Sequence, residues 1–146
     1  MYKYFLLLHI LAATVWAGGH LILAITVLPA ALKKKDPEVL LNFEHRYERI
    51  GIPSLLILVL TGLHMAYTLL PDFSQWFSFD THISKHITIK LLLLASTILL
   101  ALHARLRLIP HLKAKTLPLL AIHIIMVTVI AMLFVMTGLS FRMSFF

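Results

Sequence analysis

The chain has 146 residues and a formal net charge of +7; 60% of the residues are hydrophobic, 13% are charged, and the mean hydropathy is +0.94. A water-soluble fold of this length could not bury so much apolar surface, so the composition excludes an ordinary soluble domain and predicts an integral membrane protein. The chain contains no cysteine, which excludes disulfides, thiolate metal sites and iron–sulfur clusters.

Four apolar runs are each long enough to cross a bilayer, which takes about 20 helical residues. In chain order we expect spans at about residues 5–32, 50–70, 87–108 and 117–139. The first run is far longer than the 7–15-residue core of a signal peptide, so we expect it to be retained. The sequence therefore predicts an all-α fold, with a single transmembrane domain over residues 1–146 that forms an up-down-up-down four-helix bundle.

Two connections have a character of their own. Residues 36–49 can form a short cytoplasmic helix leading into the second span, because Asp36 can cap it and Pro37 suits its first turn. Residues 71–86 are rich in aromatic side chains, which typically gather at the membrane–water interface. We expect these to form an aromatic belt: Phe73, Trp76, Phe77 and Phe79.

Basic residues divide unequally between the two ends of the predicted bundle. Nine lie in the first and third connections: Lys33, Lys34, Lys35, Arg46, Arg49, Arg105, Arg107, Lys113 and Lys115. Three lie on the opposite side: Lys3, Lys85 and Arg142. Short loops rich in Lys and Arg stay cytoplasmic and meet anionic lipid heads. We predict a multi-pass protein of a bacterial-type inner (plasma) membrane with both termini periplasmic; the lipid bilayer, not nucleic acid, explains the charge.

Nine histidines in so apolar a chain point to function, because ionisable side chains within a span usually face the bundle interior and mark a site. A rise of 1.5 Å per residue sorts them by depth. The outer level contains His9, His64 and Lys90, with His86 just above it. The inner level contains His20, His103 and His123. His45, His82 and His111 fall at interfaces or in connections, where histidine is ordinary.

His9 and His20 lie on one face of the first span, within roughly 20° of each other and about 16 Å apart. Two imidazoles at two depths suit one or two haem b groups held between facing helices. Gly18 and Gly19 would let a flat macrocycle, a neighbouring helix or a second copy of the chain approach closely. Two alternatives stay open. The inner histidines, with Met126, could bind copper, or all the histidines could serve only in packing and hydrogen bonding.

Five segments together resemble a known family: LLHILAATVWAGGH (7–20), YERIGIP (47–53), LTG (60–62), ALHARLRLIP (101–110) and LPLLAIHI (117–124). They are similar to short stand-alone members of the copper resistance protein D family, over nearly the whole chain, and this resemblance implies copper handling. A more distant resemblance is to HemJ-type protoporphyrinogen oxidases, four-helix proteins that use haem b. That resemblance matches an essential histidine to His9 and an essential lysine to Lys90. It departs at His86 and His103, whose spacing differs from the pattern.

The leading hypothesis is therefore a membrane redox protein that binds haem b and transfers electrons or oxidises a quinol- or porphyrin-like substrate. The candidate cofactor-binding residues are His9, His20, His64, Lys90, His103 and His123, of which the metal ligands would be His9, His20, His103 and His123. If the chain is an enzyme, it is a membrane oxidoreductase, and no catalytic residue is assigned. The alternative is a membrane protein of copper binding, transport or resistance, and either could form a homodimer.

Overall fold

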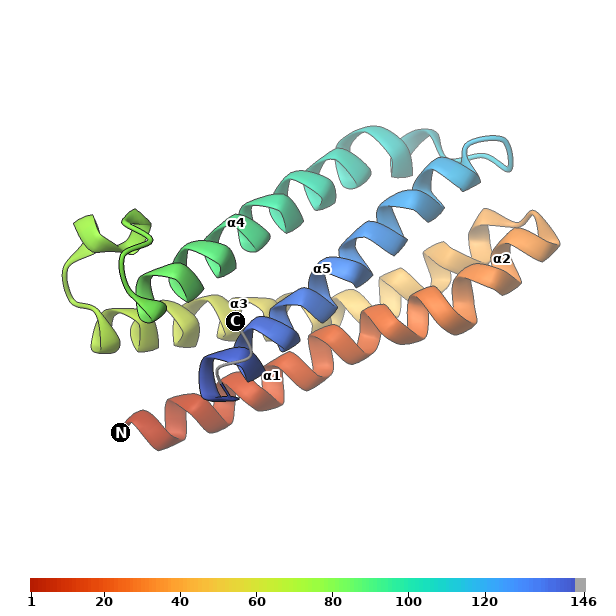
Figure 1. Cartoon of the computed structure of the whole chain (residues 1–146). Coiled ribbons are helices and arrows are strands. Elements are labelled where there is room, and N and C mark those ends of the chain that lie inside the picture. The colour runs from red at the N-terminus through yellow and green to blue at the C-terminus, as the bar shows by residue number, and fades with distance from the viewer. Residues whose placement is uncertain (144–146) are drawn as a thin grey trace.

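The computed structural model describes residues 1–143 and is helical almost throughout (Figure 1). Its elements are α1 (Tyr2–Ile22), η1 (Leu23–Val27), α2 (Leu28–Lys34), α3 (Pro37–Leu69), η2 (Phe73–Phe77), α4 (His82–His103), η3 (Ala104–Leu108), η4 (Ile109–His111) and α5 (Leu117–Met143). The elements α1, η1 and α2 form one continuous helix, as do α4, η3 and η4, so four helices are long and apolar enough to cross a membrane. The predicted all-α, four-span fold is confirmed.

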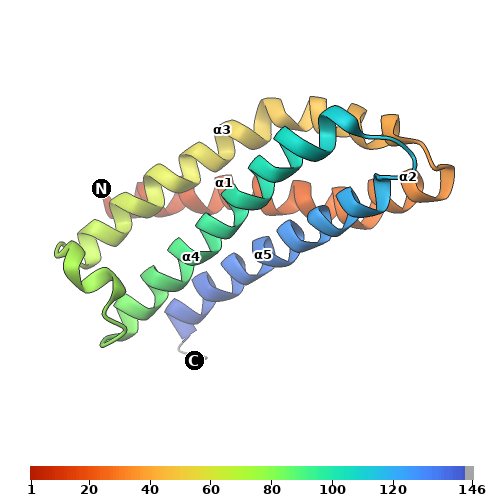
Figure 2. The same ribbon diagram turned by 90° about the horizontal axis from the view of Figure 1, so that it is seen from above.

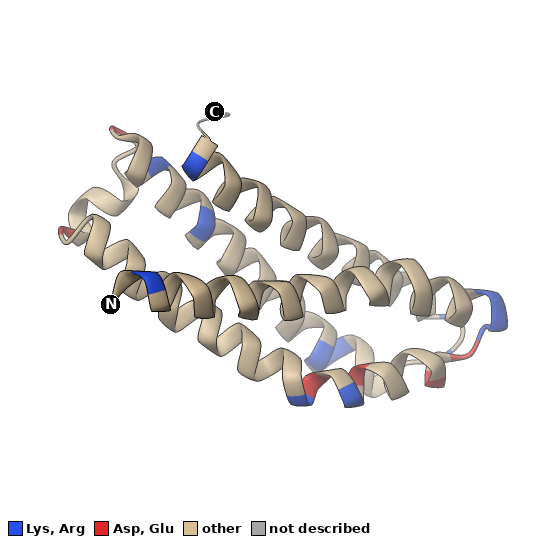
Figure 3. Cartoon of the chain, turned by 90° about the horizontal axis from the view of Figure 1, so that it is seen from below, with Lys and Arg blue, Asp and Glu red and all other residues tan. Residues whose placement is uncertain are grey.

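The four spans alternate in direction, so the bundle has two distinct ends (Figures 1 and 2). We call one the termini end, since it holds the N-terminus, the end of α5 and the connection 70–81. The other, the basic end, holds the turn at Lys35 and the connection 112–116. Lys, Arg, Asp and Glu gather toward the two ends and leave the middle of the ribbons uncharged (Figure 3). Such a charge-free middle is what the hydrocarbon core of a bilayer requires.

Helix α3 differs from the prediction, because residues 37–49 form its first part rather than a separate helix. The predicted cap is confirmed: the Asp36 carboxylate accepts a hydrogen bond from the Glu38 backbone N–H at 3.0 Å. After Pro37 in its first turn, the helix contains one further proline, Pro53, which it accommodates without a break. The helix therefore carries its charged first turns directly into the membrane-spanning part.

Trp76 in the connection 70–81 packs inside the protein, unlike the aromatic side chains of an interfacial belt. Trp76 is buried, and its indole N–H donates to the Leu70 carbonyl at 2.8 Å. The Thr88 hydroxyl donates to the Trp76 carbonyl. Phe73 and Phe77 stay more than 60% exposed, as a belt would require. For the phenylalanines the belt stays a prediction, whereas Trp76 packs at the termini end of α4.

Side-chain hydrogen bonds cap η2, within this connection, and α4, which follows it. Asp72 accepts hydrogen bonds from the side chain and the backbone N–H of Ser74 at the start of η2. These bonds lower the pKa of the Asp72 carboxyl. Thr81 and Ser84 form a reciprocal capping box that starts α4 at His82, five residues before the predicted start of the span at 87.

Tyr47 fixes the crossing of α1 and α3 near the basic end. Its ring lies between Gly19 of α1 and Gly51 of its own helix, and a Cβ atom at Gly19 would overlap it. The Tyr47 hydroxyl donates to the Trp16 carbonyl at 2.8 Å. Small residues let helix backbones approach closely in a membrane, so the two glycines and the phenol together set the distance between these two spans.

We expect Gly19→Ala to destabilise the bundle by about 1–3 kcal/mol, because the added methyl group forces Tyr47 out of its place. Gly18→Ala is the matched control: a Cβ atom there meets nothing within 4 Å, so this change is expected to be neutral or slightly stabilising. Thermal unfolding of the purified variants in detergent measures both. Equal melting temperatures for the two variants would contradict the role given to Tyr47.

Candidate metal-binding cavity

A cavity of about 220 Å³ lies inside the bundle toward the basic end, with walls from all four spans. Two of the predicted histidines face it, His20 from α1 and His123 from α5. Most of the remaining wall is apolar, with Tyr47, Glu44, Glu48 and Arg105 as the other ionisable groups. The inner level predicted from sequence depth therefore corresponds to a real space in the structure.

The ring of His20 is held in one orientation and one tautomer. Its Nδ1 lies 2.8 Å from the Trp16 carbonyl oxygen. A carbonyl can only accept, so Nδ1 carries the proton of the neutral ring and Nε2 keeps a lone pair. Trp16 packs against the ring at 4.7 Å between centroids, and Tyr47 meets it edge-on at 5.8 Å. His20 is thus presented as a nitrogen donor in a fixed position.

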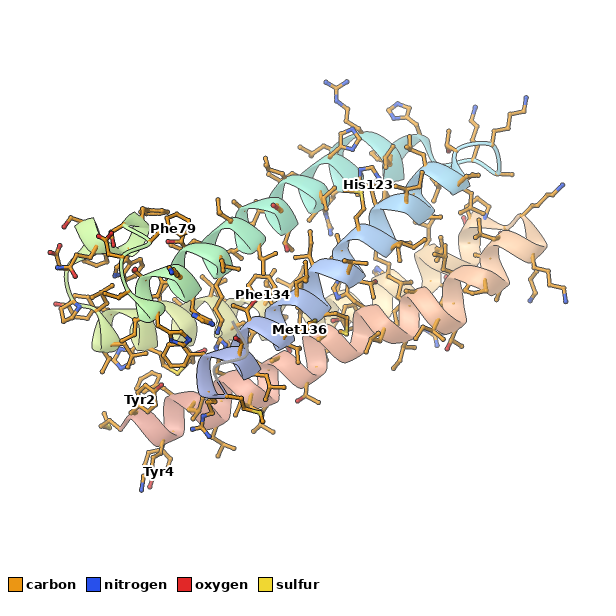
Figure 4. All side chains as sticks on the ribbon, viewed as in Figure 1. Tyr2, Tyr4, Phe79, His123, Phe134 and Met136 are labelled. Atoms are coloured by element: carbon orange, nitrogen blue, oxygen red, sulfur yellow. The ribbon has the colours of Figure 1, made fainter. Side chains whose placement is uncertain are left out.

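A hydrogen bond joins His123 of α5 to His103 of α4. Figure 4 shows His123 where α5 faces α4. His123 Nδ1 lies 3.0 Å from the Leu119 carbonyl, so it too carries the proton. His123 Nε2 then accepts a hydrogen bond from His103 Nδ1 at 2.8 Å. The rings are 4.9 Å apart and inclined by only 21°. His103 consequently keeps the lone pair on its own Nε2.

The helices that carry His20 and His103 each widen into a π-helical turn near the ring. The turn η1 begins three residues after His20, and η3 begins immediately after His103. A π turn inserts an extra residue into an α-helix and is frequently found at functional sites. The two turns lie at the same end of the bundle, and both contribute residues to the wall of the cavity.

Sequence analysis missed the acidic side of this cavity. Glu44 and Glu48 belong to a segment expected to be a solvated cytoplasmic helix, yet both line the cavity, and Arg105 forms an ion pair with Glu48. The sequence contains a pattern that indicates this wall. One helix face, with the spacing i, i+3, i+4, i+7, carries Glu44, Tyr47, Glu48 and Gly51. The continuity of α3 turns that face toward the bundle interior.

The outer level is only partly assembled at the termini end. His9 Nδ1 lies 2.8 Å from the Thr61 hydroxyl oxygen, and that hydroxyl donates to the Ile57 carbonyl at 2.6 Å. The His9 ring packs over Gly62 of α3. His64 does not join this level: it is exposed and stacks on Phe5 at 4.0 Å between ring centroids.

Lys90 completes this outer level from α4. Its ammonium lies over Gly138 of α5, where a Cβ atom would be 3.8 Å away. It is close enough to His9 for the two groups to interact electrostatically. His86 lies one helical turn from Lys90, buried against Ser140, whose hydroxyl is 3.4 Å from His86 Nε2. The structure therefore brings His9 and Lys90 together, as their depths predicted.

The structure does not gather the predicted three-histidine copper site. Within residues 1–143, no three His, Asp or Glu side chains lie close enough together to hold one metal ion. Met126 is 45% exposed, so it belongs to the outer surface of α5. His103 and His123 bring two ring nitrogens within 2.8 Å of each other, joined by a hydrogen bond. Metal–imidazole bonds of about 2 Å place two opposed nitrogens about 4 Å apart, so the His103–His123 pair would have to open by about 1 Å.

The tautomers give a direct test of this geometry. At a pH where the imidazoles are neutral, we expect His20 and His123 to carry their proton on Nδ1, because each donates to a carbonyl. Ring ¹⁵N chemical shifts of histidine-labelled protein report the tautomer. His64, which stacks on Phe5 without a hydrogen bond to residues 1–143, is the internal reference and should show the ordinary mixture. Nε2-protonated rings at His20 and His123 would refute the assignment.

Comparison with known proteins adds one finding. A family model described as copper resistance protein D matches residues 41–141, which is well over half of the chain. The matched part contains most of α3, all of α4 and most of α5, and with them Glu44, Tyr47, Glu48, His103 and His123. Comparison with curated proteins and with solved structures found no match.

Proposed function

We propose a copper-binding function for this chain, which belongs to the copper resistance protein D family. Copper is the substrate, taken up by imidazole nitrogens in the cavity at the basic end. The observation that carries the proposal is that two spans present fixed imidazoles, His20 and His123, to one cavity within the membrane. Family membership supports copper over the other metals that imidazole binds.

The donor chemistry supports this assignment. Neutral imidazole is a good ligand for copper. In metal sites, a ligating histidine usually donates its other N–H to a carbonyl or carboxylate, which fixes the ring and raises its basicity. His20 and His123 already make this bond, to Trp16 and Leu119. A copper ion at His123 Nε2 would replace the proton that His103 now donates there.

The acidic side chains of the cavity supply the charge that a copper ion needs. A cation in a low-dielectric interior is strongly disfavoured unless an anion accompanies it. Glu44 and Glu48 line the same cavity, and Glu48 forms an ion pair with Arg105. Movement of Arg105 away from Glu48 would leave two carboxylates without a partner cation in the wall of the same cavity.

The predicted haem b has no comparable support. The matching family is described by copper, and no comparison shows the relationship to HemJ-type oxidases. The cavity of about 220 Å³ is also smaller than the roughly 300–1,000 Å³ of typical ligand and cofactor pockets. A macrocycle would require the helices to separate, so we do not propose haem-dependent electron transfer or oxidoreductase activity.

We propose further that the basic end faces the cytoplasm of a bacterial-type inner membrane. The support is the distribution of charge: the turn at Lys35 and the connection 112–116 lie at the end that carries most of the Lys and Arg residues (Figure 3). Positive residues in short loops are retained on the cytoplasmic side. The cavity would then lie in the cytoplasmic half of the bilayer.

The copper proposal is tested with purified metal-free protein and a chromophoric Cu(I) chelator as competitor. We expect His20→Ala and His123→Ala each to weaken copper binding by about tenfold or more, since each removes a ligand of the proposed site. His111→Ala is the control, because His111 is exposed and lies outside the cavity.

Equal affinities for all three variants and the unaltered protein would place copper elsewhere. The absence of copper binding in the unaltered protein would end the proposal. An absorbance spectrum of protein expressed with added haem tests the haem hypothesis. A Soret band that His9→Ala or His20→Ala removes would favour haem over copper.

The orientation can be measured cleanly because the chain has no native cysteine. We expect Ala114→Cys, in the connection 112–116, to be protected from a membrane-impermeant maleimide in intact cells. Gln75→Cys, at the opposite end in η2, should be labelled. Both positions are exposed, so accessibility is matched. Labelling of position 114 but not 75 in intact cells would show the reverse orientation.

A further inference from the structure

The cavity at the basic end lies on the least closed side of the bundle. Helices α3 and α4 are both walls of the cavity, yet their backbones hardly come within 8 Å of each other, whereas α1 packs along α3 and α5, and α4 along α5. Figure 1 shows α4 diverging from α3 toward the basic end. The wall on this side comes from Ile52 and Leu55 of α3 and from Leu100 and Ala101 of α4. Ile52 and Ala101 are exposed on helices that are long and apolar enough to span a membrane, so we expect this side of the cavity to face hydrocarbon.

The size of the cavity limits what it can hold. An apolar cavity of about 150 Å³ engineered into another protein is large enough to bind benzene. At about 220 Å³, this cavity can take a single ring with a few substituents and is too small for a fused macrocycle. An alkyl tail on such a ring could extend between α3 and α4 into the bilayer.

The polar groups of the cavity call for a ligand that donates hydrogen bonds. His20 Nε2 has an unshared pair, because its Nδ1 carries the proton. Among residues 1–143, Glu44 makes no hydrogen bond through its carboxylate, so it is a second acceptor. The hydroxyl donors nearby are already used: Tyr47 donates to the Trp16 carbonyl and Thr97 to the Leu93 carbonyl. Arg105 donates one of its N–H groups to Glu48. A ring hydroxyl satisfies these acceptors, whereas a carbonyl does not.

We propose that this cavity binds a lipid-soluble molecule with one hydroxylated aromatic ring, of the quinol class, which enters from the bilayer between α3 and α4. One ring hydroxyl donates to His20 Nε2, the ring lies against Trp16, and the tail leaves past Ala101. The proposal does not require the copper function. Because copper would also use His20, the two ligands are expected to compete.

The test uses 4-bromophenol as a single-ring probe and bromobenzene as the same ring without its hydroxyl. Bromine quenches indole fluorescence on contact. Trp76→Phe leaves Trp16, in the cavity wall, as the only tryptophan. In this metal-free background we expect saturable quenching of Trp16 by 4-bromophenol, with displacement by decylhydroquinone under anaerobic conditions.

Two substitutions separate binding in the cavity from partition into detergent. Ala101→Phe fills the cavity and should abolish saturable quenching; Ala95→Phe, on an exposed part of the same helix, should leave it unchanged.

His20→Ala tests the hydrogen bond. It should weaken 4-bromophenol binding by roughly 3- to 10-fold, the effect of one hydrogen bond, and leave bromobenzene unaffected.

The possible results distinguish this proposal from the copper function. Linear quenching that is equal in the Ala101→Phe and Ala95→Phe proteins would overturn it. So would equal affinities for 4-bromophenol and bromobenzene in the presence of His20. Since no metal is added, a failure of copper binding leaves the result intact, and a failure here leaves the copper measurements intact.

Discussion

Both proposals for the cavity depend on a hydrogen bond that a buried imidazole needs inside a membrane. In hydrocarbon no water is available to satisfy a ring N–H, so a buried imidazole must find a partner within the protein. His20, His86 and His123 all use the same partner, the carbonyl four residues earlier on their own helix. This bond places the proton on Nδ1 and leaves Nε2 as an acceptor. At the cavity, a requirement of solvation therefore makes Nε2 of His20 and of His123 an acceptor for a donor hydroxyl or a metal ion.

The cavity follows from uneven packing of the four spans. Tyr47, lying between two glycines, brings α1 and α3 into close contact, and α5 packs along both α1 and α4. Nothing comparable joins α3 to α4, apart from the ion pair between Glu48 and Arg105 near the basic end. The bundle is thus tight on one side and open on the other. Since the open side faces hydrocarbon, a lipid-soluble ligand could reach His20 without passing through water.

Much of the fold could be predicted from the sequence, but only part of the site. Hydropathy located the four spans, and the rise per residue assigned His9 with Lys90 and His20 with His123 to common levels. Depth, however, does not say which way a side chain points, and this is why His64 was grouped with His9 although it faces outward against Phe5. The acidic wall was missed for another reason. Glu44 and Glu48 look solvated until α3 is known to continue unbroken from Pro37.

The outer level and the cavity carry ionisable groups of opposite charge. This difference decides from which end of the bundle a copper ion would reach the proposed site. At the termini end, Lys90 and His9 face each other, and the six carboxylates of the chain all lie in connections or in the first turns of α3. An ammonium at that level would repel a copper ion on the bundle axis, since charges interact strongly in a low-dielectric interior. At the basic end, Glu44 and Glu48 would attract one. Under the proposed copper function, the cavity is therefore better suited to exchange copper with the basic end than with the termini end.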